Sequence, residues 1–148
     1  MQHCRKCPDA VAQIRGGVEV PKLSGCIRFY QQKGCVLIVV EIFRLPRENE
    51  TGFFGFHIHQ GESCSGTDFS ETGSHYNPAD QVHPKHAGDL PPLMCCRGNA
   101  YLAVKTDRFT VHDIIGKTVV IHSNPDDFHT QPAGNAGKKI ACGVICKG

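Results

Sequence analysis

The stretch "GFFGFHIHQG", residues 52–61, decides the fold because its pattern fits a strand. In a strand, residues two apart point to the same side, whereas in a helix they do not face each other. One face of such a strand is apolar and consists of Phe54, Phe56 and Ile58. The opposite face carries His57 and His59. Two neighbouring imidazoles can hold a metal ion, although a lone H-x-H pair is also typical of the wet side of a half-buried strand.

The size and charge of the chain limit the classes of protein to which it can belong. A length of 148 residues suits one domain with a proper core. The formal net charge is +2 and the basic residues are scattered, so we expect no nucleic-acid partner. The longest apolar run, residues 35–40, is too short to cross a bilayer, so we expect no membrane partner. The start, "MQHCRKCPDA", lacks the apolar core of a signal peptide, which predicts a cytoplasmic protein, or an extracytoplasmic one if a leader was removed.

Cysteine and histidine are unusually frequent in this chain. There are nine of each, a composition that indicates metal or redox chemistry. The odd number of cysteines leaves at least one thiol without an intrachain partner. Cys4 and Cys7 form a C-x-x-C that either binds copper or cycles as a dithiol, or is part of a frayed tail. His112 and His129 are interpreted as surface residues.

Alternating hydrophobicity and frequent turn residues predict an all-β fold, an antiparallel sandwich or barrel. A short helical turn is expected at 112–116. We assign residues 10–148 to the domain and 1–9 to a flexible N-terminal tail. Two segments, 61–99 and 123–138, lack a strand pattern and are predicted to be long functional loops. The predicted strands are 10–15, 25–32, 34–44, 52–60, 100–106, 117–122 and 139–146.

The first long loop contains a second group of metal-binding residue types. Within "GSHYNPADQVHPKHAGDL" the spacings allow a loop to wrap one ion, and imidazoles with a carboxylate suit zinc. A solvated polar loop is the alternative. The four residues are His75, His83, His86 and Asp89. His122, at the end of a predicted strand, is a candidate third ligand beside His57 and His59, and an all-imidazole site suits copper or zinc.

The ordered set of motifs resembles the copper/zinc superoxide dismutase family. The motifs are "GFHIH", "SHYNP", "HAGDL", "IIGKTVVIHS", "DD" and "GNAGKKIACGVI", and they extend from about residue 10 to 146. The short gap from His59 to Cys64 and the "GDLPPL" turn are similar to the bacterial branch. The resemblance implies a flattened eight-stranded Greek-key β-barrel with two long functional loops.

The resemblance also implies a role for each candidate residue. His75 is expected to bridge the two metals, and Asp126 to join a copper histidine to a zinc histidine, by position His57 and His83. Cys64 and Cys142 match the family disulfide. The implied copper ligands are His57, His59, His75 and His122. The implied zinc ligands are His75, His83, His86 and Asp89.

One position departs from the family pattern. Three residues before Cys142 the family has an arginine that draws superoxide in, and this chain has Lys139. Lysine keeps the charge but loses the planar fork that holds an anion with two parallel bonds, so reduced activity is expected. Lys138 is expected to restore part of the local field.

The resemblance implies an enzyme that converts superoxide to dioxygen and hydrogen peroxide by copper redox cycling, with Lys139 and His75 as catalytic residues and zinc in a structural role. The expected partner is the superoxide anion, and the protein is expected to be a homodimer or a monomer. A non-catalytic copper/zinc-binding or copper-buffering protein on the same scaffold is the alternative. A structural domain that holds only zinc is a further one.

Overall fold

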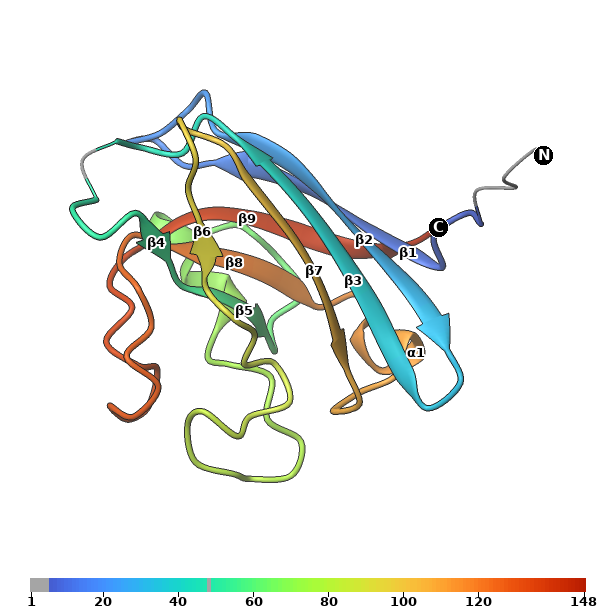
Figure 1. Cartoon of the computed structure of the whole chain (residues 1–148). Coiled ribbons are helices and arrows are strands. Elements are labelled where there is room, and N and C mark those ends of the chain that lie inside the picture. The colour runs from blue at the N-terminus through green and yellow to red at the C-terminus, as the bar shows by residue number, and fades with distance from the viewer. Residues whose placement is uncertain (1–5, 48) are drawn as a thin grey trace.

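The computed structural model describes residues 6–47 and 49–148, and its order of elements is shown in Figure 1. The described residues are almost entirely strands and loops, as predicted. The strands are β1 (Ala10–Gly16), β2 (Ser24–Gln32), β3 (Cys35–Phe43), β4 (Phe53–Phe54), β5 (Phe56–His59), β6 (Leu93–Met94), β7 (Ala100–Thr106), β8 (Thr118–His122) and β9 (Lys139–Lys147). The helical elements are the 3₁₀ segment η1 (Thr67–Thr72) and the one-turn helix α1 (Val111–Ile114).

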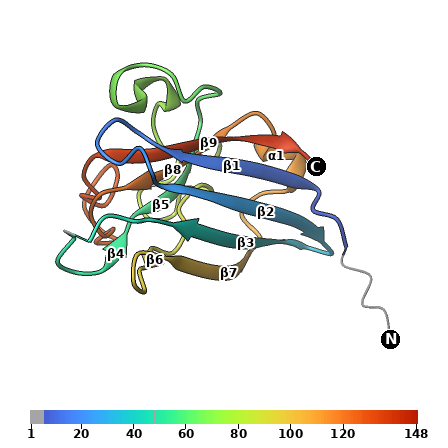
Figure 2. The same ribbon diagram turned by 90° about the horizontal axis from the view of Figure 1, so that it is seen from above.

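Seven strands form one antiparallel sheet in the order β5-β8-β9-β1-β2-β3-β7. The sheet curls from β7 through the middle strands to β5 as a half-barrel, which agrees with the predicted barrel (Figures 1 and 2). The chain crosses from β3 to β5 at the far edge, returns to β7 beside β3, and crosses again to β8 beside β5. Such long returns to a neighbouring strand are the Greek-key type of connection.

A second, two-stranded sheet pairs β4 with β6. Because β4 continues into β5 and β6 leads into β7, this short pair lies between the two edge strands of the main sheet. The predicted strand at 52–60 is therefore two strands. They are separated at Gly55, whose amide donates to the carbonyl of Asn124 in the second long loop at 2.8 Å.

The core lies inside the curl and follows from period-two alternation. In β3, Val36, Ile38, Val40 and Ile42 are fully buried, while the residues that alternate with them are only partly buried. Phe29, Phe54 and Phe56 are fully buried with them. Burial of side chains of this size stabilises the fold by roughly 1.5–3 kcal/mol each.

The strand predictions hold to within two residues at most ends, and the differences have local causes. The helical turn expected at 112–116 is found one residue earlier, because Thr110 caps α1 and accepts a hydrogen bond from the amide of Asp113. β6 and η1 were not expected, because two-residue strands and 3₁₀ turns carry no hydrophobic period. Cys4 and most of the predicted 1–9 tail lie outside the described residues, and the flexibility of the tail stays a prediction. Among the described residues, no helix has the length and apolarity needed to cross a bilayer.

The two long connections extend from the same side of the sheet (Figure 1). The first is tied to the last strand by the disulfide Cys64–Cys142, which the family resemblance implied and whose Cα atoms are 5.8 Å apart. The link spans 78 residues. A cross-link over a loop of this length removes much of the entropy of the unfolded chain.

Cys64→Ser is expected to destabilise the metal-free protein by about 2–4 kcal/mol, because the unfolded chain regains its loop entropy. The measurement is urea unfolding of metal-free protein, without reductant. Cys96→Ser, at an exposed free cysteine, is the matched control and is expected to unfold like the wild type. Equal midpoints for Cys64→Ser and the wild type would contradict this role of the disulfide.

Candidate metal centre

Three of the predicted ligands lie on two paired strands. β5 runs antiparallel to β8, with His57 opposite Val120 and His59 opposite Thr118. The amide of His122 donates to the carbonyl of Gly55 at 2.8 Å, so these two residues lie opposite each other. His122 is therefore on the same face of the sheet as His57 and His59. A Cβ at Gly55 would lie 3.2 Å from the Cβ of His122, and therefore glycine leaves room for the imidazole.

His75 comes from the first long loop, which is bonded to the free edge of β5. The amide of Tyr76 donates to the carbonyl of Ile58 at 2.8 Å, and the amide of Ile58 donates to the carbonyl of Gly88 at 2.9 Å. The amide of Gly88 in turn donates to the carbonyl of Tyr76 at 2.8 Å. Two distant parts of the loop are thus held against one strand, which brings His75 beside His57, with ring centroids 4.0 Å apart.

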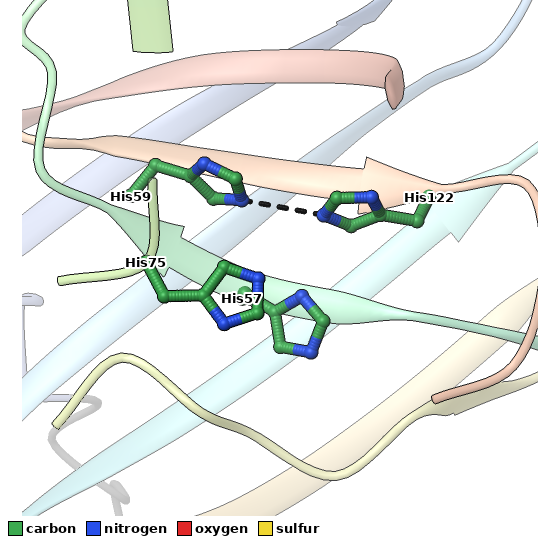
Figure 3. A group of neighbouring side chains, drawn as sticks. All are labelled: His57, His59, His75 and His122. Carbon is green, nitrogen blue, oxygen red and sulfur yellow. Dashed lines mark hydrogen bonds between the residues drawn. The ribbon is translucent and has the colours of Figure 1, made fainter. Parts of the chain in front are cut away.

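The Nδ1 atoms of His59 and His122 both form hydrogen bonds with backbone carbonyls. Nδ1 of His59 donates to Gly73 O at 2.8 Å, and Nδ1 of His122 donates to Gly137 O at 3.3 Å. With the protons on Nδ1, both Nε2 atoms carry lone pairs, and these atoms face each other at 3.2 Å (Figure 3). Two lone pairs at this distance repel unless a cation lies between them, so the arrangement fits a metal ion.

Two further nitrogens complete this first cluster. Nδ1 of His57 and Nε2 of His75 are buried and have no hydrogen-bond partner. Buried polar atoms without partners are costly, and such orphans need an explanation. A metal ion supplies it, because one donor atom from each of four residues lies within 4.8 Å of the others. The four residues of this first cluster are His57, His59, His75 and His122.

A second cluster uses the other nitrogen of the same bridging ring. Nδ1 of His75 lies 2.7 Å from Oδ1 of Asp89 and 3.4 Å from Nδ1 of His86. Nδ1 of His83 is 3.1 Å from Oδ2 of Asp89 and is otherwise without a partner. Three imidazoles and one carboxylate are a donor set that zinc prefers in a tetrahedron. The four residues of this second cluster are His75, His83, His86 and Asp89.

Asp126 links the two clusters from outside. Nε2 of His57 donates to its Oδ2 at 2.7 Å, and Nε2 of His83 donates to its Oδ1 at 2.8 Å. Because Nε2 carries the proton in both histidines, Nδ1 keeps a lone pair that points into the centre. Carboxylates outside a metal site commonly fix the histidine ligands in this way. Gly134 lies against this bridge, since a Cβ there would be 2.0 Å from Oδ1 of Asp126.

Burial sets the charge state of these groups in the metal-free protein. It lowers the pKa of His57, lowers that of His59 well below its ordinary value, and lowers that of His122 to about 3. Burial alone would raise the pKa of Asp89 and Asp126, but their histidine partners outweigh it and lower both. His57, His59 and His122 are therefore held as neutral imidazoles and Asp89 and Asp126 as ionised carboxylates, the forms that bind metal.

Lys139 begins β9 opposite His122 and extends toward the first long loop. Its Nζ donates to Oγ1 of Thr72 at 2.8 Å and to Gly73 O at 3.0 Å, the carbonyl that also accepts from His59. Partial burial lowers the pKa of Lys139. Lys138 was expected to add to the positive field beside Lys139. Its Nζ instead lies 3.2 Å from the carboxylate of Glu19, which offsets its charge, and both side chains are exposed.

All eight side chains that the sequence singled out, namely the seven ligand candidates and Asp126, converge in one buried region. Their individual assignment to copper or zinc stays a prediction. Sequence reasoning missed the contributions of Thr72, Gly73 and Gly134. The carbonyl of Gly73 and the missing Cβ of Gly134 leave no side-chain signal, and the hydroxyl of Thr72 is brought to Lys139 only by the fold. His112 and His129 are exposed, as expected.

Comparisons with known proteins agree with this geometry. Residues 23–145 match the family model for copper/zinc superoxide dismutase (SODC). The chain is 36% identical over 136 residues to copper-zinc superoxide dismutase 1 of Aquifex aeolicus (strain VF5), which covers 82% of this chain and 79% of that relative. It is 34% identical over 154 residues to copper-zinc superoxide dismutase 3 of Arabidopsis thaliana, with 92% and 88% covered.

A relative with a different printed role is more distant. The chain is 27% identical over 162 residues to the copper chaperone for superoxide dismutase of Rattus norvegicus, covering 94% of this chain and 59% of that protein. The family model spans most of the chain and the relatives above 30% identity are named as dismutases. The chain therefore belongs to the copper/zinc superoxide dismutase family.

Proposed function

We propose that this chain is a superoxide dismutase that converts superoxide to dioxygen and hydrogen peroxide, with copper in the first cluster and zinc in the second. The observation that carries the proposal is the sharing of one ring, because His75 presents Nε2 to one cluster and Nδ1 to the other. Four imidazoles suit a copper ion, and three imidazoles with a carboxylate suit zinc. Copper bound here would supply one-electron chemistry by alternating between two oxidation states, which zinc does not.

The chain's own residues prepare the site in three ways. The hydrogen bonds of His59, His122 and Asp126 fix which nitrogen of each ring carries the proton. His75 has an unpartnered Nε2, so this atom can hold a proton whenever it is not engaged with a metal. The ring stays in place meanwhile, because its Nδ1 remains beside Asp89.

Lys139 supplies the positive charge for the substrate. Its ammonium is held by Thr72 and Gly73 at the rim of the first cluster, where it can attract an anion. A lysine offers a point charge with no planar fork, so it attracts superoxide without fixing its orientation by two parallel bonds. The proposed enzyme therefore has lower activity than one with arginine at this position.

The first test combines metal analysis of the purified protein with an assay of superoxide consumption before and after copper loading. Copper-dependent turnover, with copper and zinc each near one equivalent, is the expected result. Bound copper without turnover would instead support the copper-buffering alternative, and zinc alone would support the structural one. Either outcome would overturn the proposed activity.

Asp126→Asn is expected to weaken binding of both metals by about 10–100-fold. An amide has one accepting oxygen, so His57 and His83 can no longer both donate to this residue. Competition with chelators measures the two affinities. Asp127→Asn is the matched control, because within the described residues the carboxylate of Asp127, in the same loop, bonds only to His129 and Thr130. Unchanged affinity for either metal in Asp126→Asn would refute the bridging role.

Lys139→Arg is expected to raise kcat/KM severalfold, because the guanidinium adds a bidentate anion contact to the same charge. The increase should be largest at low ionic strength, where attraction of the anion is least screened. The measurement is superoxide turnover against salt concentration at equal copper content. Lys147→Arg, at the far end of the same strand, should behave like the wild type. An unchanged kcat/KM in Lys139→Arg would show that position 139 does not limit capture of the substrate.

A further inference from the structure

Arg108 lies outside every motif of the sequence and contacts the loop that carries the second cluster. It follows β7 and precedes α1. Its Nη1 lies 2.9 Å from Pro84 O, 3.1 Å from His86 O and 3.4 Å from Asp89 O. The first two distances are ordinary hydrogen bonds and the third is a longer, shared one.

The three carbonyls belong to the loop at its metal-binding positions. Two are the carbonyls of the ligand candidates His86 and Asp89 themselves, and the third belongs to Pro84, the residue after His83. One guanidinium therefore holds the backbone at or beside every candidate ligand of the second cluster that this part of the loop supplies. Residues 83–89 form no helix or strand of their own, although Gly88 is bonded to β5 at Ile58.

The base of Arg108 is fixed by the core. The next residue, Phe109, is buried, and the one after it, Thr110, forms a reciprocal capping box with Asp113 at the start of α1. A side chain mounted on such a rigid base can position a loop that has little regular structure. Gln131, from the second long loop, makes the complementary contact, since its side chain bonds to both the amide and the carbonyl of His83.

We propose that Arg108 is a positioning residue for the zinc site, which keeps the loop ligands in place before the metal binds. The inference rests on the proposed function, because it takes zinc as the occupant of the second cluster. Preorganised ligands lose less conformational entropy on binding, so the contact strengthens metal affinity without touching the metal.

The charge of Arg108 makes the prediction sharp. Removal of a positive charge near a cation site would by itself favour zinc. Weaker zinc binding in Arg108→Gln therefore cannot come from the lost charge, and it is the result expected from the lost hydrogen bonds. Because Arg108 is exposed, water is expected to replace its guanidinium at the three carbonyls and the fold to survive.

The test is zinc affinity of the metal-free, disulfide-bonded full chain, measured by competition with a chelator. Arg108→Gln is expected to bind zinc about tenfold more weakly. Arg108→Lys, which keeps a charged donor but not the fork, should recover part of the loss. Cobalt(II) used in place of zinc gives a second readout, because its visible absorption reports the ligand geometry, and Arg108→Gln should change this spectrum.

Lys105→Ala is the matched control, because Lys105 is an exposed cation of the neighbouring strand β7 and makes no hydrogen bond or ion pair to the loop in the described residues. It should bind zinc as the wild type does. Zinc affinity of Arg108→Gln within twofold of the wild type would overturn the inference, as would an equal loss in Lys105→Ala. A lower melting temperature of metal-free Arg108→Gln with unchanged zinc affinity would likewise show a purely structural role.

Should Arg108→Gln fail to fold, Arg108→Lys decides the question, and wild-type affinity in that variant would overturn the requirement for the guanidinium. Failure of the proposed function looks different in the same experiment. Wild-type protein that binds no zinc would refute the metal centre itself. Wild-type binding without any effect of the Arg108 variants would refute only the inference about Arg108.

Discussion

The single imidazole of His75 is the constraint on which the rest of the structure depends. Its two nitrogens belong to two different clusters. The clusters must therefore lie at two different edges of one flat ring. Strands β5 and β8 supply one side and the first long loop supplies the other. The loop must therefore approach β5 along its free edge, and the bonds among Ile58, Tyr76 and Gly88 hold it there. A shift of this loop along β5 by one residue would turn the ring away from both clusters.

The same constraint is unfavourable for the metal-free protein. Six imidazoles are gathered with little access to water, and two facing nitrogens both carry lone pairs. Since the pKa values of His57, His59 and His122 are lowered by burial, the unfolded chain binds more protons than the folded one below the ordinary histidine pKa, and folding is opposed there. The fold tolerates this arrangement because the cross-link Cys64–Cys142, the bridge of Asp126 and the apolar curl of the sheet hold the two loops from outside.

Local periodicity predicts the strands and the face of the ligand candidates on them, and this explains why part of the centre can be located from the sequence. Alternation in residues 52–61 places His57 and His59 together, and the spacing of His83, His86 and Asp89 marks a loop that wraps an ion. Pairing of distant segments has no such local signal. The break of the strand at Gly55, the two-residue strand β6 and the contacts of Arg108 all depend on partners more than fifteen residues away. The disulfide pairing and the shared role of His75 were expected only through the family resemblance.

Position 139 joins the capture of the anion to the geometry of a ligand. Gly73 O accepts one hydrogen bond from Lys139 and another from His59, so a single carbonyl orients both the ammonium that we propose attracts superoxide and a candidate copper ligand. Cys142 lies three residues further along β9, and its disulfide partner lies in the segment that leads into η1 and on to Gly73. The cross-link therefore joins β9 to the segment that carries this carbonyl. An ammonium has three donors and uses two of them here, on Thr72 and Gly73. One N–H therefore remains for an anion, and a single donor cannot fix the orientation of an anion as the two parallel bonds of a guanidinium can.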